Sequence, residues 1–480
     1  MRSEMLIGGE WTRGSGTATF TTHDPATGEV LAELPEAGAG EVHAAVRSAA
    51  TAFTAPEWAE MTPAARARVL LRAADLVEEH ADELARLETT DQGQPLSISG
   101  GISVPNLAEH LRYYAGWATK ITGVTSPVSV PDVDHRTRRE PLGVCALITP
   151  WNFPLMILGW KLAPALATGN TAVVKPAEQT PLSTLRFAEL LERAGVPAGV
   201  VNIVTGGPEA GRALVAHPEV AKVSFTGSTE VGREIAAEAG RSLKRCSLEL
   251  GGKAPSIVAA DADVDSVLEG NVLGGLLNSG QVCAAYTRFY VDRRRSDEFA
   301  EKLAAAAGSM RLGRGLDENT QLGPLVSGEQ VEQVQRYVDL GRQEGAELLT
   351  GGERPHGELA AGHFFRPTVF ANVGQDMRIA REEIFGPVLS VLPYDDPEEL
   401  APRANDTEYG LAAVVWSRDI GTANRLARQV RAGTVWINMP PLLDAAAAWG
   451  GMKASGTGRE MGWEAIESYT EVKSIWTNLA

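Results

Sequence analysis

The sequence predicts an α/β protein built on open parallel sheets. Between residues 143 and 252, short apolar runs alternate with helical stretches at the spacing of βαβ units. A second alternating region extends from about residue 252 to 440. With 480 residues, of which 44% are hydrophobic and 22% charged, the chain is long enough for two or three globular domains. Two α/β layers in one chain favour a ligand cleft between them.

The elements follow in chain order. Residues 41–90 carry apolar residues at helical spacing and are predicted to form helices. The continuous apolar run "GVCALIT" at 143–149 is predicted to be a buried parallel strand. After it we expect helices at 154–168, 181–195, 209–217 and 229–240, and strands at 171–175, 199–206, 221–227 and 244–252. Residues 122–140 and 465–480 fit neither half, and each is predicted to be a strand of a small appended sheet or an oligomer contact.

Charge and cysteine content exclude several classes of protein. A net charge of −17 argues against a general nucleic-acid binder, which needs a basic face. Three cysteines, Cys145, Cys246 and Cys283, provide no disulfide framework, so we expect a reducing, cytoplasmic compartment. The N-terminus has no apolar signal region, and no run of eighteen apolar residues predicts a membrane span. We expect no metal ion.

Two stretches indicate a dinucleotide cofactor. "SFTGSTEVG" at 224–232 reads as a strand end, a turn at Gly227 and a helix start, where Ser228 or Thr229 could cap the helix and contact a phosphate. A plain strand-to-helix turn is an equal alternative for this stretch alone. "VVKPAEQTP" at 173–181 places Lys175 and Glu178 at a strand's carboxyl end, where they could reach a ribose. A carboxylate there repels a 2′-phosphate and favours NAD over NADP, although a solvated surface pair is the alternative.

Three further stretches carry candidate catalytic groups. Cys283 in "NSGQVC" lies among small residues and is either a core filler or a nucleophile. Asn152 in "TPWNFP" follows a strand and could donate to an oxyanion, although a turn asparagine is the simpler interpretation. Glu249 in "LELGGK" ends another strand and is either a general base or a solvent-facing glutamate. Cys145 and Cys246 lie within apolar strands and are interpreted as core residues.

These stretches together resemble the aldehyde dehydrogenase superfamily, whose non-phosphorylating members use NAD or NADP. "PWNFP", "GNTAVVKPAEQTPLS", "FTGSTEVG", "LELGGK", "NSGQVC", "EEIFGPVL", "NDTEYGLAA" and "WGGMKASGTGREMG" occur in the family's order. The resemblance covers nearly the whole chain. It implies an aldehyde dehydrogenase-like fold with a Rossmann-type cofactor domain at 1–120 and 141–251, an α/β catalytic domain at 252–454, and a small bridging β oligomerisation element at 121–140 and 465–480. Subunits of this family pair as dimers or tetramers, so a homo-oligomer is expected.

The resemblance also implies a role for each site residue. Cys283 is the nucleophile, deprotonated or easily so; Glu249 is the general base; and Asn152 forms the oxyanion hole with the backbone N–H of Cys283. Residues implied to bind NAD are Trp151, Lys175, Glu178, Gly227, Ser228, Glu383 and Phe385. The thiol would attack the aldehyde, hydride transfer to NAD would leave a thioester, and water activated by Glu249 would release the acid.

The predicted substrate is an apolar or aromatic aldehyde. The resemblance implies a tunnel wall without an identifiable carboxylate or basic group, formed by Phe153, Trp160, Leu277, Leu442, Leu443 and Trp449. The main alternative is betaine aldehyde or an aminoaldehyde, held in an aromatic cage; Trp449 favours this alternative and Leu277 opposes it. A coenzyme-A-acylating dehydrogenase is disfavoured by Glu249, and a cysteine hydrolase by the lack of a histidine near Cys283 in sequence. A crystallin-like structural role would leave the catalytic set unexplained.

Overall fold

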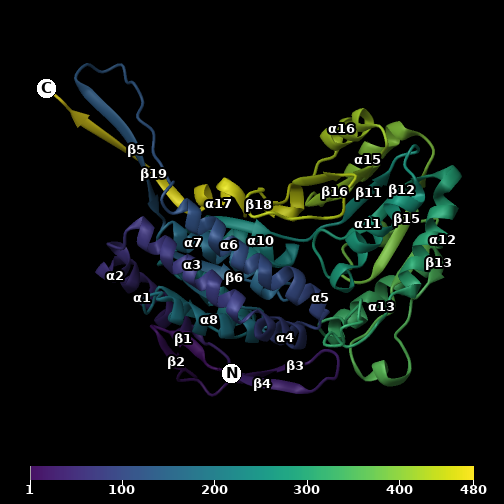
Figure 1. The fold of residues 1–480 in the computed structure, drawn as a ribbon, viewed down its shortest axis with the longest axis horizontal. Helices are drawn as coiled ribbons and strands as arrows, with labels where there is room; N and C mark the ends of the chain where they lie inside the picture. Colours follow the sequence, from purple (N-terminus) through teal and green to yellow (C-terminus); the bar gives the residue numbers. More distant parts are fainter. Residues whose placement is uncertain (1) are drawn as a thin grey trace.

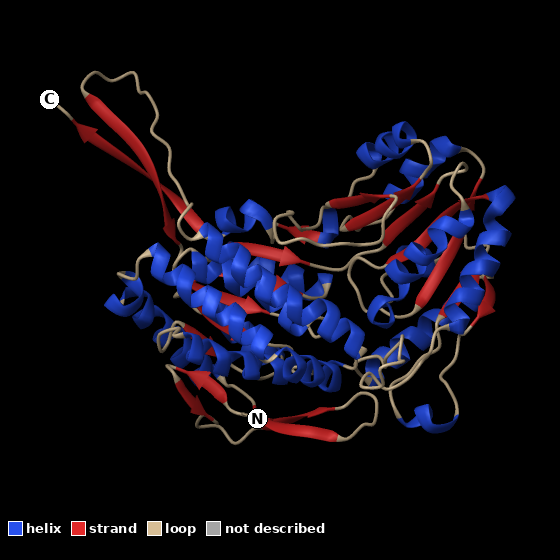
Figure 2. Ribbon diagram, in the orientation of Figure 1, coloured by secondary structure: helices blue, strands red, loops and turns tan. Residues whose placement is uncertain are grey.

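The computed structural model describes residues 2–480 and confirms the predicted α/β class. Figure 1 shows two α/β units side by side, with a two-stranded arm that projects from one of them and carries the C-terminus. Strands form the interior of each unit and helices cover the faces of the sheets (Figure 2). The prediction of two layered units is therefore correct, whereas the exact domain boundaries stay a prediction.

The first sheet has the strand order expected of a dinucleotide-binding fold. Its central parallel strands run in the order β8-β7-β6-β9-β10, so the order reverses between β6 and β9, the point at which ligands of such sheets bind. Both β6 and β7 are buried along their whole length, which explains their continuous apolar runs. Its eight strands, in spatial order, are β18 (Gly456–Thr457), β10 (Arg245–Glu249), β9 (Val220–Thr226), β6 (Val144–Ile148), β7 (Thr171–Lys175), β8 (Val201–Ile203), β1 (Met5–Ile7) and β2 (Glu10–Thr12).

Helices cover both faces of this sheet. One face packs on α7 (Pro154–Ala167) and α8 (Leu182–Ala194), which are backed by α3 (Pro63–Glu79), α4 (Ala81–Gln92) and α6 (Val104–Trp117). The other face packs on α1 (Ala39–Thr54), α9 (Pro208–Ala216) and α10 (Thr229–Arg241). Two short helices, α2 (Pro56–Ala59) and α5 (Leu96–Ile98), join the longer ones. None of the helices in residues 2–480 is long and apolar enough to cross a membrane.

The second sheet has seven strands and is parallel except for its edge strand β13. In spatial order they are β13 (Glu347–Thr350), β14 (Thr368–Ala371), β15 (Val388–Tyr394), β12 (Tyr286–Asp292), β11 (Ala254–Val258), β16 (Ala412–Trp416) and β17 (Thr434–Ile437). One face packs on α11 (Val264–Leu276) and α12 (Arg293–Ser309). The other packs on α13 (Gly328–Gln343), α14 (Arg378–Arg381), α15 (Leu400–Asn405) and α16 (Ile420–Gln429).

The two stretches that fit neither half pair with each other. Strand β5 (Val133–Pro141) runs antiparallel to β19 (Thr470–Asn478) and forms the projecting arm in Figure 1. Both strands are shorter than predicted. Residues 122–132 contain only an isolated bridge at Thr125, and α17 (Gly462–Ser468) occupies the start of the second stretch. A separate N-terminal hairpin, β3 (Thr19–His23) with β4 (Val30–Pro35), was not indicated by the sequence.

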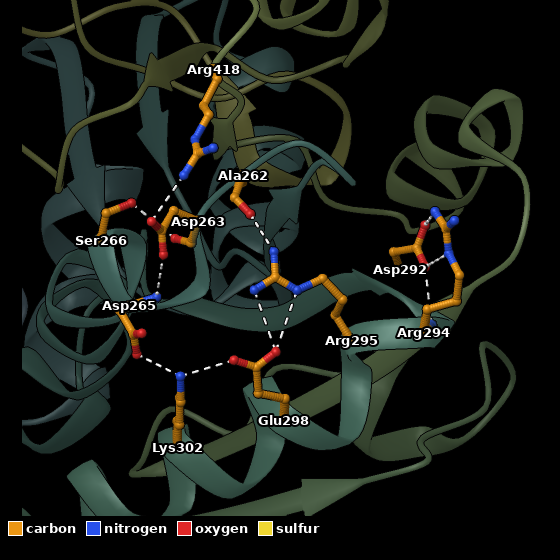
Figure 3. Close-up of polar contacts among 10 residues, drawn as sticks. All are labelled: Ala262, Asp263, Asp265, Ser266, Asp292, Arg294, Arg295, Glu298, Lys302 and Arg418. Carbon is orange, nitrogen blue, oxygen red and sulfur yellow. Dashed lines mark hydrogen bonds and ion pairs between the residues drawn. The ribbon is translucent and has the colours of Figure 1, made fainter.

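Charged side chains form a network around the start of α11 and along α12 on the surface of the second unit (Figure 3). Asp263 caps α11 by accepting from the N–H of Asp265 at 3.1 Å and also pairs with Arg418 at 2.9 Å. Lys302 on α12 joins Asp265 at 2.6 Å and Glu298 at 2.9 Å. These pairs are exposed to solvent, where water and salt screen their charges, so they add little to the stability of the fold.

Candidate active site

The loop before β12 turns sharply to present Cys283. A 3₁₀ turn at Leu277–Gly280 contains Asn278 and Ser279 with positive φ angles of 48° and 56°, followed by Gly280 at 74°. A Cβ atom at Gly280 would lie 2.3 Å from the carbonyl oxygen of Gly386, so only glycine fits there. This strained turn leaves Cys283 partly exposed and packed against the edge of an apolar cluster.

The surroundings of Cys283 in this structure favour the neutral thiol over the thiolate. Burial raises the pKa of Cys283 to about 12, and the carboxylates of Glu383 and Glu249 add to the rise. Backbone N–H groups of Cys283 and Ala284 oppose it. The thiol is therefore protonated at neutral pH in this arrangement, and its activation requires a proton acceptor or an added positive charge nearby.

Asn152 lies directly beside the cysteine loop. It follows β6 in the loop that leads into α7, and its side chain is 3% exposed. Its Nδ2 donates to the carbonyl oxygen of Gln281 at 2.9 Å, and Asn278 Nδ2 donates to the carbonyl oxygen of Asn152, also at 2.9 Å. These two bonds join the loop after β6 to the loop before β12. The side-chain amide of Asn152 therefore contacts the backbone of the cysteine loop two positions before Cys283.

Glu249 ends β10 as predicted, but it is buried rather than solvent-facing. Its side chain is 3% exposed, and neither carboxylate oxygen has a hydrogen-bond partner among residues 2–480. Burial raises its pKa well above the ordinary value, and the charge of Glu460 raises it further, whereas Lys161 and Arg459 oppose the rise. Such a carboxyl group binds a proton more readily than an exposed glutamate does, as a general base requires.

Two residues near Glu249 were not found from the sequence. Lys161 on α7 is fully buried and forms an ion pair with Glu460, and Ser224 donates to the same Glu460 oxygen at 2.9 Å. The sequence did contain a signal, because Lys161 is the one charged residue in the apolar helix "PLMILGWKLAPALA". A buried lysine on such a helix indicates a buried acidic partner.

A cavity of about 550 Å³ opens at the switch point of the first sheet. Five of the seven residues predicted to bind the cofactor line it: Trp151, Lys175, Glu178, Gly227 and Ser228. Ser228 caps α10 by accepting from the N–H of Val231 at 3.3 Å, which leaves the helix N-terminus facing the cavity; Thr229 does not cap it. A Cβ atom at Gly227 would lie 2.4 Å from the ring of Phe225. The cavity thus has the size, glycine turn and helix N-terminus that a dinucleotide requires.

Lys175 and Glu178 form a pair at the rim of this cavity. Lys175 Nζ lies 3.6 Å from a carboxylate oxygen of Glu178 and donates to the carbonyl oxygen of Pro176 at 2.9 Å. Burial lowers the pKa of Lys175, and Glu178 opposes that shift. The side chain of Glu178 remains 39% exposed, so its carboxylate is available to a ligand.

Glu383 and Phe385 come from the second unit and lie at the inner end of the site. Glu383 accepts from the N–H of Gly252 at 2.9 Å, and burial raises its pKa to about 7. The ring of Phe385 meets that of Trp151 edge-on at 5.1 Å. Both residues therefore contact the first unit between the cavity and Cys283.

Five of the six predicted tunnel residues belong to one apolar cluster with Cys283. They are Phe153, Trp160, Leu277, Leu443 and Trp449. The rings of Trp160 and Trp449 lie 6.2 Å apart, and Trp436, which the sequence did not indicate, lies 6.2 Å from Trp449. Trp160 Nε1 donates to Asn106 Oδ1 at 2.8 Å, which fixes its indole ring.

Two features of the predicted tunnel need correction. Leu442 is 62% exposed and lies outside the apolar cluster, because the irregular segment after β17 turns it to solvent. The surroundings are also not free of carboxylates. Asp444 directly follows Leu443, and its charge, after burial, raises the pKa of Glu109 on α6. The two exposed acids therefore lie near each other beside the tryptophan cluster.

Comparison with known proteins gives consistent results across the chain. The Aldehyde dehydrogenase family matches residues 11–475. Phenylacetaldehyde dehydrogenase of Pseudomonas fluorescens is 48% identical over 98% of this chain and 95% of its own. An aldehyde dehydrogenase from Bacillus cereus, solved with NAD+, is 48% identical with a TM-score of 0.97, covering 100% of this chain and 97% of the other. Betaine aldehyde dehydrogenase from Staphylococcus aureus, also with NAD+, is 40% identical with a TM-score of 0.97, covering 99% and 95%.

Proposed function

The chain belongs to the aldehyde dehydrogenase family and is an NAD-dependent aldehyde dehydrogenase, and we propose that it oxidises an apolar or aromatic aldehyde to the carboxylic acid with Cys283 as nucleophile. The observation that carries the assignment of the nucleophile is the link between Asn152 and Gln281, which puts an amide donor beside the thiol. A panel of aldehydes scored by NADH formation, with and without coenzyme A, tests the activity. An acyl-coenzyme A product would contradict the proposed release of a free acid.

The first chemical step is proposed to form a bond between the sulfur of Cys283 and the aldehyde carbon. The carbonyl oxygen then gains negative charge, and the side-chain amide of Asn152 and the backbone N–H of Cys283 donate to it. Because burial raises the pKa of Cys283 to about 12, the thiol must lose its proton as it attacks. The buried carboxylate of Glu249, with no hydrogen-bond partner of its own among residues 2–480, is a suitable acceptor.

The second half of the reaction is proposed to depend on Glu249 as base. NAD, when bound, would supply the hydride acceptor, and loss of hydride from the aldehyde carbon would convert the adduct to a thioester. Glu249 releases the proton that it took from Cys283 to solvent and then takes a proton from a water molecule that attacks the thioester carbon, and the Cys283 sulfur leaves as the thiolate. Trp151, Lys175, Glu178, Gly227 and Ser228 are proposed to hold the dinucleotide in the cavity, and Glu383 and Phe385 to hold its reacting end.

We expect the enzyme to use NAD more efficiently than NADP. Glu178 would accept hydrogen bonds from the ribose hydroxyls of NAD but repel the 2′-phosphate of NADP. Glu178→Gln should therefore reduce the ratio of kcat/KM for NAD to kcat/KM for NADP about tenfold, equivalent to about 1.4 kcal/mol. Steady-state rates with both cofactors measure it. Glu298→Gln is the matched control, since it removes one charge of similar exposure from ion pairs with Arg295 and Lys302, and none of these three residues lines the cavity. Equal efficiency of the wild type with both cofactors would contradict the proposal.

The apolar cluster around Cys283 supports an apolar or aromatic substrate. Phe153, Trp160 and Trp449 are each no more than 3% exposed, so the wall near the thiol is dry. Burying a phenyl-sized group against it would contribute about 2 kcal/mol from area alone. An anionic semialdehyde would lose its hydration without meeting a cation. A relative 48% identical to this chain is a phenylacetaldehyde dehydrogenase, which supports the same class.

The second candidate is a cationic aldehyde, such as betaine aldehyde or an aminoaldehyde. Three tryptophan rings with neighbouring centroids 6.2 Å apart offer the faces that attract an ammonium group. Glu109 and Asp444 would also favour a positive charge near the cluster. Leu277 supplies no aromatic face to complete a cage. The relative of known structure that acts on betaine aldehyde is 40% identical, below the phenylacetaldehyde relative.

A matched pair of substrates separates the two candidates. Betaine aldehyde and its neutral isostere 3,3-dimethylbutanal have nearly the same shape and differ mainly in charge. We expect kcat/KM to be about tenfold higher for the neutral aldehyde, because the cation must lose its hydration against an apolar wall. Trp449→Ala should then lower kcat/KM for both substrates by a similar factor. A strong preference for the cation that is lost in Trp449→Ala would instead establish an aromatic cage.

We propose that subunits pair through the arm formed by β5 and β19. Val472, Trp476 and Leu479 on or just after β19 are 50%, 57% and 66% exposed, which is unusual for large apolar side chains. Such a surface favours a second copy of the chain as its cover, in line with the predicted homo-oligomer. Analytical ultracentrifugation of the full chain distinguishes dimer from tetramer, and a monomer at micromolar concentration would exclude the proposal. A cytoplasmic location stays a prediction.

A further inference from the structure

Helix α7 begins immediately after the loop that carries Asn152, and its first turn lacks a local cap. Phe153 is the N-cap residue and has an apolar side chain, and Pro154 follows at the first helical position. The N–H groups of the first turn of a helix have no partner within the helix and need one elsewhere. The N–H of Leu155 finds its partner in Glu88 Oε2 at 3.2 Å.

Glu88 is a distant residue held rigidly for this contact. It lies on α4, its side chain is 0% exposed, and its other oxygen accepts from Gln94 Nε2 at 2.9 Å. Gln94 Oε1 in turn accepts from the hydroxyl of Ser103 at 3.2 Å. Burial raises the pKa of Glu88, and the group that opposes this rise most is the backbone N–H of Leu155.

The loop between β6 and α7 is therefore fixed at both ends. On one side, Asn152 is joined to the cysteine loop through Gln281 and Asn278. Leu155, three positions after Asn152 in the chain, is joined on the other side to Glu88. A backbone shift of about 1 Å at a donor is enough to lower a catalytic rate by about 10².

We propose that Glu88 is a positioning residue for the reaction: by binding the N–H of Leu155 it sets the backbone of the Asn152 loop so that the amide of Asn152 meets the oxygen of the Cys283 adduct. The proposal rests on the proposed role of Asn152. It adds a residue outside the site, on a helix that contacts neither thiol nor cofactor cavity, to the groups that determine the rate of the first chemical step.

A second carboxylate on the same helix provides a matched comparison. Asp91 is 1% exposed and caps α8 instead, accepting from the N–H of Leu182 at 2.8 Å and from the hydroxyl of Thr22 at 2.8 Å. Burial raises the pKa of both Glu88 and Asp91 to about 7. The two residues thus have the same chemistry and burial, but only Glu88 binds the helix that follows Asn152.

The test measures the pre-steady-state burst of NADH at saturating NAD and aldehyde. Glu88→Leu removes the acceptor and should lower the burst rate by about tenfold or more, whereas Glu88→Gln retains an acceptor oxygen and should stay within about threefold of the wild type. NAD affinity, measured by tryptophan fluorescence, should not change in either variant. Asp91→Leu should lose a similar amount of thermal stability as Glu88→Leu but keep its burst rate within about threefold.

A double-mutant cycle separates positioning from a general structural effect. Asn152→Ala alone should lower the burst rate by about 10²–10³, and adding Glu88→Leu to it should lower the rate little further. Additive losses, or equal losses in Glu88→Leu and Asp91→Leu, would overturn the positioning role. An unchanged rate in Asn152→Ala would instead overturn the proposed oxyanion donor. If Glu88→Leu does not fold, Glu88→Asp, which is one methylene shorter, withdraws the carboxylate from Leu155 and takes its place in the cycle.

Discussion

Replacement of Cys283 by alanine is expected to abolish aldehyde oxidation, with kcat reduced by at least about 10⁴-fold, while NAD binding is retained. The sulfur is the atom proposed to bond to the aldehyde carbon, and no other side chain beside Asn152 can replace it. Cys283 lies outside the cofactor cavity, so the affinity for NAD should not depend on it. NADH absorbance measures turnover, and isothermal titration measures NAD binding in the same preparation.

The other two cysteines are the controls for this experiment. Cys145 is buried within β6, where burial raises its pKa to about 12, and Cys246 lies on β10 with a raised pKa for the same reason. Cys246→Ala should keep kcat within about twofold of the wild type, because that thiol does not border the site. Substantial turnover in Cys283→Ala, or loss of activity in Cys246→Ala, would show that the nucleophile has been misassigned.

The parts of the fold that could be predicted are those whose burial leaves a pattern in the sequence. Strands β6 and β7 are buried on both faces and therefore appear as continuous apolar runs, and α8 ends at Gly195, whose φ of 93° suits a left-handed cap. The hairpin formed by β3 and β4 is short and mostly exposed, so its sequence carries no such pattern. The pairing of β5 with β19 joins residues more than 300 positions apart, which no local pattern reveals.

The same division applies to the site. Cys283, Asn152 and Glu249 lie near glycines or just after predicted strands, and polar or reactive side chains at such positions indicate a functional site. Their mutual arrangement was not visible, because the bond from Asn152 to Gln281 joins loops of two different sheets. Glu460 and Glu88 were missed since each acts through tertiary contacts, with Lys161 and Leu155 respectively. Leu442 was misplaced because side chains of an irregular loop follow no fixed period.

Replacement of Glu249 by glutamine is expected to separate the two halves of the reaction. Glutamine has nearly the same shape but cannot take a proton from water, so thioester hydrolysis should slow by about 10²–10⁴-fold, the usual contribution of a general base. Glu249 is also the proposed acceptor of the Cys283 proton, but the partly exposed thiol can lose that proton to water as well, so hydride transfer should slow less than thioester hydrolysis. Rapid mixing should then show a burst of about one NADH per active subunit followed by slow turnover, the signature of an accumulating acyl-enzyme.

The pH dependence gives an independent measure of the same residue. Because burial and the charge of Glu460 raise the pKa of Glu249, its basic form is lost as the pH falls through that raised value rather than near 4.5. Wild-type steady-state turnover should therefore fall tenfold per pH unit on the acid side of this pKa, and Glu249→Gln should lack that limb. Glu464→Gln on the nearby α17 is a control for a change of one charge outside the site. Wild-type steady-state rates and an unchanged pH profile in Glu249→Gln would exclude Glu249 as the base and leave the water to be activated by another group.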